Sequence, residues 1–572
     1  MNLLLSTLNS KYIHASLGIY SLSAYLSAAK LPDIHVELRE YTTQTPLLNI
    51  LADMQPLQPD IIALAVYIWN KDESMRLTKV LKTAMPGCTI VLGGPEVSFN
   101  AVQVLADNPE VDYIVQGEGE IVFAELVQFI KQGGNLPTCV SCHAQTSDSV
   151  YAVSDLNTLP FAYTQFSAAE LANKIIYYES SRGCPYACSY CLSGISRHVR
   201  YKDFRQVTAE LGYLISRGVK QVKFVDRTYN LDAKHYLPIM QFLAAQDTDI
   251  NFHFEIKADL LTDEVLAFLR TVPKGRFQFE VGIQTTSART LQAINRVDNW
   301  HRLAGSVHKL LEFGNIHVHV DLIAGLPYED LETFKNSFNN VHSLWADMLQ
   351  LGFLKVLHGS TISGQICTHG YKYMPCPPYE VLSNNYISYT ELRQLKLIED
   401  LLEKYHNSGR YKHTLRYLLT TCYCDDAFAF YEQFAHYLES QNQHLQSLSS
   451  KNNLQLLLGF IEQNAALRPY MPTLYELLHL DTFVVGENWR NEFFAARIDT
   501  ADNKDYLENF WRDNDLVGKY LPDYRFTSWR QVKKIYRMEE FVIDGQSRLY
   551  IWDEQSAQLI NIDNEDFYRA IQ

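Results

Sequence analysis

Short apolar runs alternate with helix-like segments over the first 130 residues, and this alternation limits the fold more than any other feature of the chain. Apolar runs of about four to eight residues bounded by turns are typical of strands, and strands that alternate with helices build parallel sheets. We therefore expect residues 1–150 to form a doubly wound, Rossmann-like parallel sheet. The expected strands are Asn2–Leu8, Ile61–Trp69, Thr89–Leu92 and Tyr113–Val115, and the expected first helix is Leu17–Ala29.

A second alternating series begins near residue 175, after a connecting region that contains Gly133, Gly134, Pro137 and Pro160. Six expected strands with helical patterns between most of them predict a partial, TIM-like (β/α)6 barrel over residues 151–369. In such a barrel the chemistry belongs at the carboxyl ends of the strands. The expected strands are Ile175–Tyr178, Gln221–Val225, Asn251–Ile256, Phe277–Ile283, His317–Ile323 and Met348–Leu354.

Helical patterns dominate after the proline-rich turn around residue 377. We expect residues 370–572 to form a mainly helical extension of unknown role, with strands near its end. The expected helices are Leu392–Tyr405, Tyr411–Leu419 and Phe428–Ser440, and the expected strands are Glu540–Ile543 and Leu549–Trp552.

The composition restricts the environment and the partners of the chain. The 65 acidic and 50 basic side chains give a formal charge of -15, which argues against a surface that tracks nucleic-acid phosphates. The longest apolar stretches are too short to span a bilayer, and the first residues lack the basic start and cleavage site of a signal peptide. We expect a cytoplasmic protein with no membrane partner. The net charge disfavours a nucleic-acid partner but leaves room for a local basic groove.

Three closely spaced cysteines follow the first expected barrel strand. Cys184, Cys188 and Cys191 have the spacing C-x3-C-x2-C. A structural zinc site needs four protein ligands, whereas three cysteines on a four-iron cluster leave one iron open to a small molecule. The spacing favours the cluster, and the alternative is a zinc site completed by a distant residue such as His198.

With Tyr190 directly before the last cysteine, this segment resembles the signature of the radical S-adenosylmethionine (SAM) superfamily. The resemblance implies that Cys184, Cys188 and Cys191 hold a 4Fe-4S cluster whose open iron binds SAM. It also implies reductive cleavage of SAM to methionine and a 5′-deoxyadenosyl radical, with the electron supplied by a donor such as flavodoxin or ferredoxin.

Later segments resemble the motifs of the same family in the same order. Asp226, after the second barrel strand, corresponds to polar groups near the SAM amino group. Glu280 and Gln284 correspond to groups near the methionine and ribose ends of SAM. Ile323 and Gly325 correspond to backbone that meets the adenine.

The order of a doubly wound sheet followed by this barrel resembles the cobalamin-binding branch of the superfamily. The segments that carry this resemblance contain His14, Gly93-Gly94 and Gly117-Glu118, which the resemblance assigns to the corrinoid. Glycine pairs let a nucleotide tail pass close to the backbone.

The chain departs from the histidine-ligated form of this branch at two motifs. Tyr12 stands where that form has an aspartate, three residues instead of two separate His14 from Gly18, and Ala65 replaces a serine. An axial histidine is normally oriented by a carboxylate. The departures weaken the assignment of His14 as a cobalt ligand more than they weaken the cofactor.

The sequence thus predicts a radical SAM enzyme that uses cobalamin to methylate an unreactive carbon of an unknown substrate. The first alternative is a radical cyclase, rearrangement or sulfur-insertion enzyme without methyl transfer. The second alternative is a non-catalytic regulator that binds an iron-sulfur cluster or a corrinoid.

Overall fold

The computed structural model describes residues 1–441, 448–487, 489–498 and 503–568. The chain divides into two compact units. The first comprises residues 1–346 and 351–392, and the second comprises residues 347–350 together with the chain from residue 393 onward. None of the helices within the described ranges is both long and apolar enough to cross a membrane.

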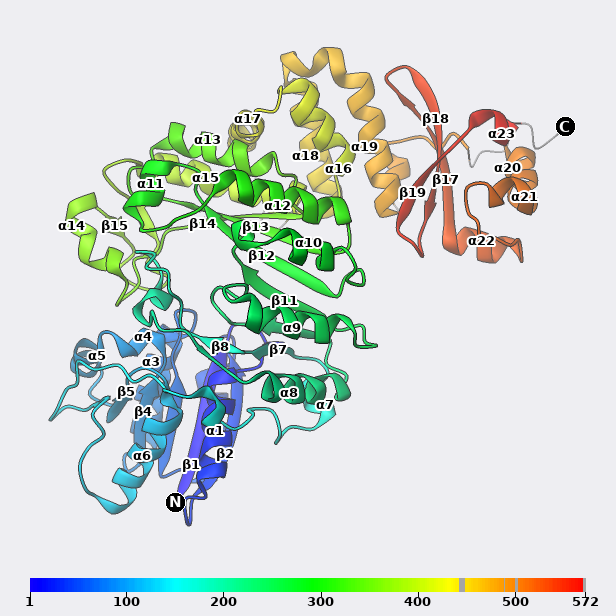
Figure 1. The fold of residues 1–572 in the computed structure, drawn as a ribbon. Coiled ribbons are helices and arrows are strands. Elements are labelled where there is room, and N and C mark those ends of the chain that lie inside the picture. The colour runs from blue at the N-terminus through cyan, green and yellow to red at the C-terminus, as the bar shows by residue number, and fades with distance from the viewer. Residues whose placement is uncertain (442–447, 488, 499–502, 569–572) are drawn as a thin grey trace. The chain divides into compact units, whose positions relative to one another are not determined.

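The N-terminal part of the first unit is a six-stranded sheet with the order β2-β1-β3-β4-β5-β6 (Figure 1, blue to cyan). The ladders from β2 to β5 are parallel, and β6 is antiparallel to β5. The expected doubly wound sheet is therefore confirmed. Its strands are β1 (Asn2–Asn9), β2 (His35–Thr42), β3 (Ile61–Ala65), β4 (Thr89–Gly93), β5 (Tyr113–Val115) and β6 (Val140–Ser141), and its helices are α1 (Leu17–Ala29), α2 (Leu47–Met54), α3 (Lys71–Ala84), α4 (Pro95–Ser98), α5 (Ala101–Asp107) and α6 (Gly119–Gln132).

Strand β3 ends at Ala65, four residues before the end of the expected strand at Trp69. The Asn70 side chain causes this early end, because its Oδ1 accepts a hydrogen bond from the Tyr67 N–H at 2.7 Å and its amide donates to the Ala65 carbonyl at 3.1 Å. An asparagine that bonds to nearby backbone in this way turns the chain. The turn directs Tyr67 to the carboxyl edge of the sheet.

Strand β2 is a strand that we did not expect. It lies at the edge of the sheet, its first residue is exposed, and the other residues are half-buried. A strand without a fully buried row has no continuous apolar run, so the sequence pattern does not reveal it.

The second sheet has the order β14-β13-β12-β11-β10-β7, which is the sequential order expected for a barrel built of strand-helix repeats (Figure 1, green). The ladders from β7 to β13 are parallel. In the described part of the chain β7 and β14 do not pair, so the barrel is partial, as expected. Its strands are β7 (Ile175–Tyr178), β10 (Gln221–Phe224), β11 (Asn251–Ile256), β12 (Phe277–Gln284), β13 (His317–Ala324) and β14 (Met348–Phe353), and its helices are α8 (Phe204–Ser216), α9 (Ala233–Ala244), α10 (Asp263–Leu269), α11 (Ala288–Ala293), α12 (Trp300–Phe313) and α13 (Leu331–His342).

Strand β12 shows how this sheet separates its core from its chemistry. Phe277, Phe279 and Val281 are buried, whereas the alternate residues of the strand are only half-buried. Successive side chains of a strand point to opposite faces, so one face packs in the apolar core and the other carries the polar groups. Among the latter is Glu280.

Short elements connect the larger ones in the first unit. The hairpin of β8 and β9 is antiparallel and pairs Arg182 with Arg200. The short elements are α7 (Ala168–Leu171), β8 (Ser181–Arg182), β9 (Arg200–Tyr201), α14 (Ile366–His369), β15 (Lys372–Tyr373) and β16 (Val381–Ser383).

The second unit is mainly helical with strands near its end, as expected. These strands form a three-stranded antiparallel sheet, and its third strand, β19, was not expected. The buried Asp481 of α19 accepts hydrogen bonds from the His413 and Thr414 N–H groups at 3.0 and 2.9 Å and thereby caps the start of α16. The elements are α15 (Tyr389–Leu401), a π-helical turn (Leu402–His406), α16 (Lys412–Tyr417), a second π-helical turn (Leu418–Cys422), α17 (Ala427–Ser440), α18 (Ser450–Gln463), α19 (Met471–Val485), α20 (Lys504–Arg512), α21 (Asn514–Gly518), α22 (Trp529–Ile535), β17 (Tyr536–Ile543), β18 (Gln546–Asp553), β19 (Gln558–Ile562) and α23 (Asn564–Tyr568).

Candidate functional site

The three cysteines of the spacing motif line one cavity of about 200 Å³, here called the cysteine cavity. Gly183 begins the loop that carries them, with φ of 100°, and a Cβ at this position would lie 2.3 Å from the His198 carbonyl oxygen. Only glycine fits such a backbone. The residues that line the cysteine cavity are Cys184, Tyr186, Cys188, Tyr190, Cys191, Ser193, Arg227, Thr228, Glu255, Ile256, Lys257, Glu280, Gly282, Gln284, Arg296 and Asp321.

The donor set in this cavity fits an iron-sulfur cluster held by three thiolates. Cys184 and Cys188 are buried, and Cys191 is half-buried. Burial raises the pKa of the Cys188 thiol, and the nearby Arg296 guanidinium acts in the opposite direction. His198 does not line the cavity. Within the described ranges no group of three or more His, Cys, Asp and Glu side chains is arranged to hold a single metal ion.

Three carboxylates lie at the strand ends that line the same cavity. Glu255 of β11 is in register with Glu280 of β12, and Asp321 of β13 is in register with Gly282. His253 Nε2 is 3.2 Å from Glu280 Oε2. Burial raises the pKa of Glu255 to about 7, even though Arg227 lowers it. The sequence analysis did not include Glu255, although its position near the end of a barrel strand could have identified it.

Gln284 also lines the cysteine cavity, and a β-bulge between Gly282 and Gln284 places it there. Its backbone has φ of 74°, and its buried Oε1 has no hydrogen-bond partner among the described residues. A buried amide oxygen without a donor is costly in a closed protein, so this atom fits a site that a ligand completes. Of the residues predicted to contact SAM, the structure brings Tyr190, Glu280 and Gln284 into the cavity.

Asp226, Ile323 and Gly325 are not among the lining residues, although the sequence placed them at the SAM site. The carboxylate of Asp226 is buried and accepts three hydrogen bonds, from the Ser180 N–H and from the Ser180 and Ser181 hydroxyls, at 2.6–2.9 Å. Burial raises its pKa to about 6, despite these bonds. Gly325 lies just past β13, where its carbonyl accepts a hydrogen bond from the Asn384 amide at 2.9 Å. The contacts predicted for these three residues stay predictions.

A second cavity of about 460 Å³ lies at the carboxyl edge of the N-terminal sheet and is here called the glycine cavity. Gly94 and Gly117 have φ of 110° and 93°, and a Cβ at either would lie within 2.4 Å of a neighbouring backbone oxygen. The fold itself therefore requires these glycines. The lining residues are Gly18, Ile19, Leu22, Ala63, Leu64, Ala65, Tyr67, Val91, Leu92, Gly93, Gly94, Pro95, Ser98, Phe99, Val115, Gly117, Glu118, Gly119, Glu120, Phe123, Glu179, Arg182, Leu192, Ser193 and Arg227.

The glycine cavity contains every residue predicted for the corrinoid except His14. His14 Nδ1 is 2.8 Å from the Tyr177 hydroxyl, and the His14 backbone forms a bridge with Ile175 of β7. Burial is the main cause that lowers the pKa of this imidazole. His14 thus contacts the barrel, and the structure does not bring it among the residues of the cavity.

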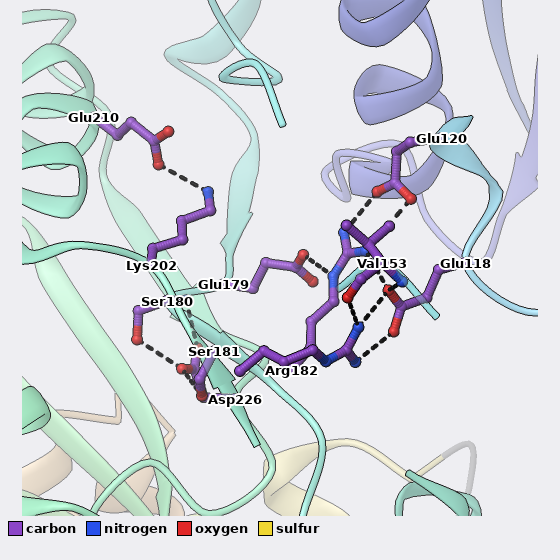
Figure 2. A network of polar contacts seen from close by, with 11 residues as sticks. Glu118, Glu120, Val153, Glu179, Ser180, Ser181, Arg182, Lys202, Glu210 and Asp226 are labelled. Carbon is purple, nitrogen blue, oxygen red and sulfur yellow. Dashed lines mark hydrogen bonds and ion pairs between the residues drawn. The ribbon is translucent and has the colours of Figure 1, made fainter. Parts of the chain in front are cut away.

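A network of charges lies at the wall of the glycine cavity, and Figure 2 shows its contacts. Arg182 lies two residues before Cys184, and its guanidinium contacts Glu179, Glu120 and Glu118 at 2.5, 2.6 and 3.1 Å. Glu118 also forms an ion pair with the Arg200 guanidinium, with an N–O distance of 2.6 Å. The arginine and glutamate side chains in these ion pairs are largely buried. Removing one partner would therefore leave a buried charge unpaired, which destabilises the fold. We call Arg182, Arg200 and these three glutamates the arginine clamp.

The two cavities share part of their lining. Ser193, from the loop after the cysteines, and Arg227, from the turn after β10, line both. The loop holds its shape next to the thiols, because the Ser193 N–H donates to Cys191 Sγ at 3.4 Å. The thiol-lined cysteine cavity and the glycine cavity are therefore neighbours that share these two side chains.

Three family models match the chain. The B12 binding domain matches residues 4–127, the radical SAM superfamily matches residues 178–341, and a protein of unknown function (DUF4080) matches residues 367–560. The first model covers the sheet with the glycine cavity, and the second covers most of the barrel with the cysteine cavity. The chain thus contains a radical SAM domain, preceded by a B12 binding domain and followed by a domain of unknown function.

Relatives are similar to this chain in sequence, and a solved structure is similar to it in fold. An uncharacterized methyltransferase of Pyrococcus horikoshii is 22% identical over 409 residues, which are 66% of this chain and 87% of the relative. The cobalamin-dependent radical SAM methyltransferase TokK of Streptomyces tokunonensis is 24% identical over 50% of this chain and 45% of its own length, so the chain spans less than half of that relative.

A structure of the cobalamin-dependent SAM radical enzyme OxsB, with aqua-cobalamin and SAM bound, resembles the fold with a TM-score of 0.61. The match has 15% identity and covers 86% of this chain and 84% of that one.

The clamp predicts how stability depends on Glu118. The substitution Glu118→Gln removes a charge and leaves the guanidinium of Arg200, which is 7% exposed, without its carboxylate. We expect the free energy of unfolding at pH 7 to fall by about 2 kcal/mol, toward the lower end for a buried pair because Glu118 is partly exposed. Urea denaturation, monitored by amide hydrogen exchange in β4 and β5, measures this free energy. The control is Glu125→Gln, a substitution of an exposed glutamate.

The pH dependence of stability gives a second test of the same substitution, Glu118→Gln. Burial raises the pKa of Glu118, but the bonds from Arg200 and Arg182 outweigh burial and lower it below its ordinary value of 4.5. Ionised Glu118 therefore stabilises the fold above about pH 4.5, and this contribution is lost as the pH falls through the lowered folded-state pKa. The difference in the free energy of unfolding between wild type and Glu118→Gln should therefore become smaller below pH 4.5. A difference that does not change with pH would contradict a stabilising role for ionised Glu118.

Proposed function

We propose that this chain is a cobalamin-dependent radical SAM enzyme that methylates an unreactive carbon of its substrate. The observation that carries the proposal is that Ser193 and Arg227 line both cavities, so that a thiol-lined cavity and a glycine-lined cavity adjoin. A reaction that needs a radical and a methyl group at the same carbon requires this arrangement. The methyltransferase names of relatives support the reaction class.

In this proposal the cysteine cavity holds the cluster and SAM. Cys184, Cys188 and Cys191 supply the thiolates, and when bound the cluster supplies the electron that cleaves SAM reductively. The unpaired Gln284 Oε1 accepts a hydrogen bond from SAM, and Glu280 and Tyr190 complete the polar wall of its pocket. Lys257 and Arg296 are held in place by the shared Asp298, so this wall is rigid before SAM binds.

The glycine cavity holds the corrinoid, which supplies the methyl group. The strand ends at Gly93-Gly94 and Gly117-Glu118 present backbone without large side chains. His14 is directed to Tyr177, so we propose that no histidine from this position binds the cobalt. The substrate then lies where the cavities meet. We further propose that the enzyme acts in the cytoplasm and takes its electrons from flavodoxin or ferredoxin.

The first test is SAM cleavage by anaerobically reconstituted protein that carries both cofactors. We expect the wild type to form both 5′-deoxyadenosine and S-adenosylhomocysteine, and Cys191→Ala to form 5′-deoxyadenosine at a rate lower by at least about 1000-fold, because electron delivery and SAM anchoring use one cluster. The exposed Cys367→Ala is the matched control.

Two outcomes would count against this function. Equal cleavage by wild type and Cys191→Ala would exclude the cluster as the source of the electron. Formation of 5′-deoxyadenosine without any S-adenosylhomocysteine would favour the cyclase, rearrangement or sulfur-insertion reading.

The second test concerns the cobalt ligand. Because His14 does not line the glycine cavity, we expect His14→Ala to bind cobalamin within about twofold of wild type and with the same absorbance spectrum. Tyr177→Phe removes the same hydrogen bond but keeps the imidazole, so it controls for packing. A spectral change in His14→Ala that Tyr177→Phe lacks would show that His14 binds the cobalt.

A further inference from the structure

Basic side chains that line the two cavities differ in whether the protein neutralises them. Arg182 contacts three glutamates of the arginine clamp. Lys257 Nζ lies 3.0 Å from Asp259 Oδ1 and also contacts Asp298. Arg296 Nε lies 2.5 Å from Asp298 Oδ2. These three cationic side chains are therefore already neutralised by ion pairs with carboxylates of the protein.

Arg227 is the exception. It is exposed, it lines both cavities, and no hydrogen bond or ion pair joins its side chain to any residue within the described ranges. Glu255 is near enough to influence it electrostatically but forms no ion pair with it. A guanidinium without a partner at the wall of a cavity is free to bind an anion from outside the protein.

The backbone that carries Arg227 is fixed on both sides. Asp226 accepts three hydrogen bonds from Ser180 and Ser181. On the other side the Tyr229 N–H donates to the Glu255 carbonyl at 2.9 Å, and Asn230 exchanges two hydrogen bonds of 2.8 Å with the Lys257 backbone. The buried carboxylate of Asp226 therefore anchors the turn that presents Arg227 to both cavities.

We propose that Arg227 binds a carboxylate or phosphate group of the substrate where the cysteine cavity meets the glycine cavity. This inference rests on the proposed function and adds the substrate class, an anionic small molecule. The planar guanidinium binds two oxygens of such a group at once. Fixing the anion at the shared wall would orient the remainder of the substrate between the two ends of the site. The same chemistry could come from the carboxylate of SAM, and the experiment separates the two sources.

The test uses inorganic phosphate as the probe and protein loaded with cluster, cobalamin and SAM, in a zwitterionic buffer. Equilibrium dialysis gives the dissociation constants of phosphate and of SAM for wild type and Arg227→Gln. The control is Arg205→Gln, which removes the same charge from an exposed position that lines neither cavity.

We expect Arg227→Gln to weaken phosphate binding at least about tenfold, since a hydrogen bond to a charged group contributes more than a neutral one. SAM binding should change by less than about twofold, and Arg205→Gln should match wild type. Arg227→Lys keeps the charge without the planar fork and should recover part of the phosphate affinity.

Three results would overturn the proposal. The first is a wild type that does not bind phosphate in the millimolar range, and the second is phosphate binding that Arg227→Gln leaves unchanged. The third is a loss of SAM binding of about tenfold in Arg227→Gln together with competition between SAM and phosphate, which would assign Arg227 to SAM. The proposed function fails separately, through absent SAM cleavage or absent cobalamin binding in the same preparation.

Discussion

The pairing of Arg182 with three carboxylates is the contact on which the rest of the site depends. Arg182 lies directly before Gly183, where the cysteine loop begins. Its partner Glu118 lies in the loop before α6, and its partner Glu120 lies in the first turn of α6, at the edge of the N-terminal sheet. One guanidinium thus ties the segment that leads into the cysteine loop to the edge of the N-terminal sheet. An unpaired charge that is buried in this way destabilises the fold, so the loss of one partner also weakens the contribution of the others. Figure 2 shows the carboxylates around this side chain.

The division of labour within the site follows from strand geometry. Alternate residues of β11, β12 and β13 face the core and the cavity, so apolar side chains such as Phe279 stabilise the sheet while Glu255 and Glu280 serve the site. Parallel strands end at one edge, and this edge collects the polar groups of several strands in one place. The B12-binding sheet uses the same principle, because its cavity lies at the carboxyl ends of β3, β4 and β5.

The sequence predicted most of the fold, and it predicted the site where chemistry follows from spacing. Apolar runs and the cysteine motif are local patterns, so both parallel sheets and the thiols of one cavity could be inferred. The half-buried β2 has no such pattern. The burial of Asp226 could not be predicted, because its carboxylate is held by Ser180 and Ser181, 46 and 45 residues away in the sequence. His14 likewise finds its partner on a distant strand.

In the proposed function, two adjoining cavities hold a cluster next to the thiols and a corrinoid next to the glycines. Anomalous diffraction at the iron and cobalt edges, from anaerobic crystals loaded with both cofactors, tests it most directly. We expect an iron peak among Cys184, Cys188 and Cys191 and a cobalt peak in the cavity lined by Gly93, Gly94 and Gly117. A cobalt peak outside that cavity, or iron without cobalt, would contradict it.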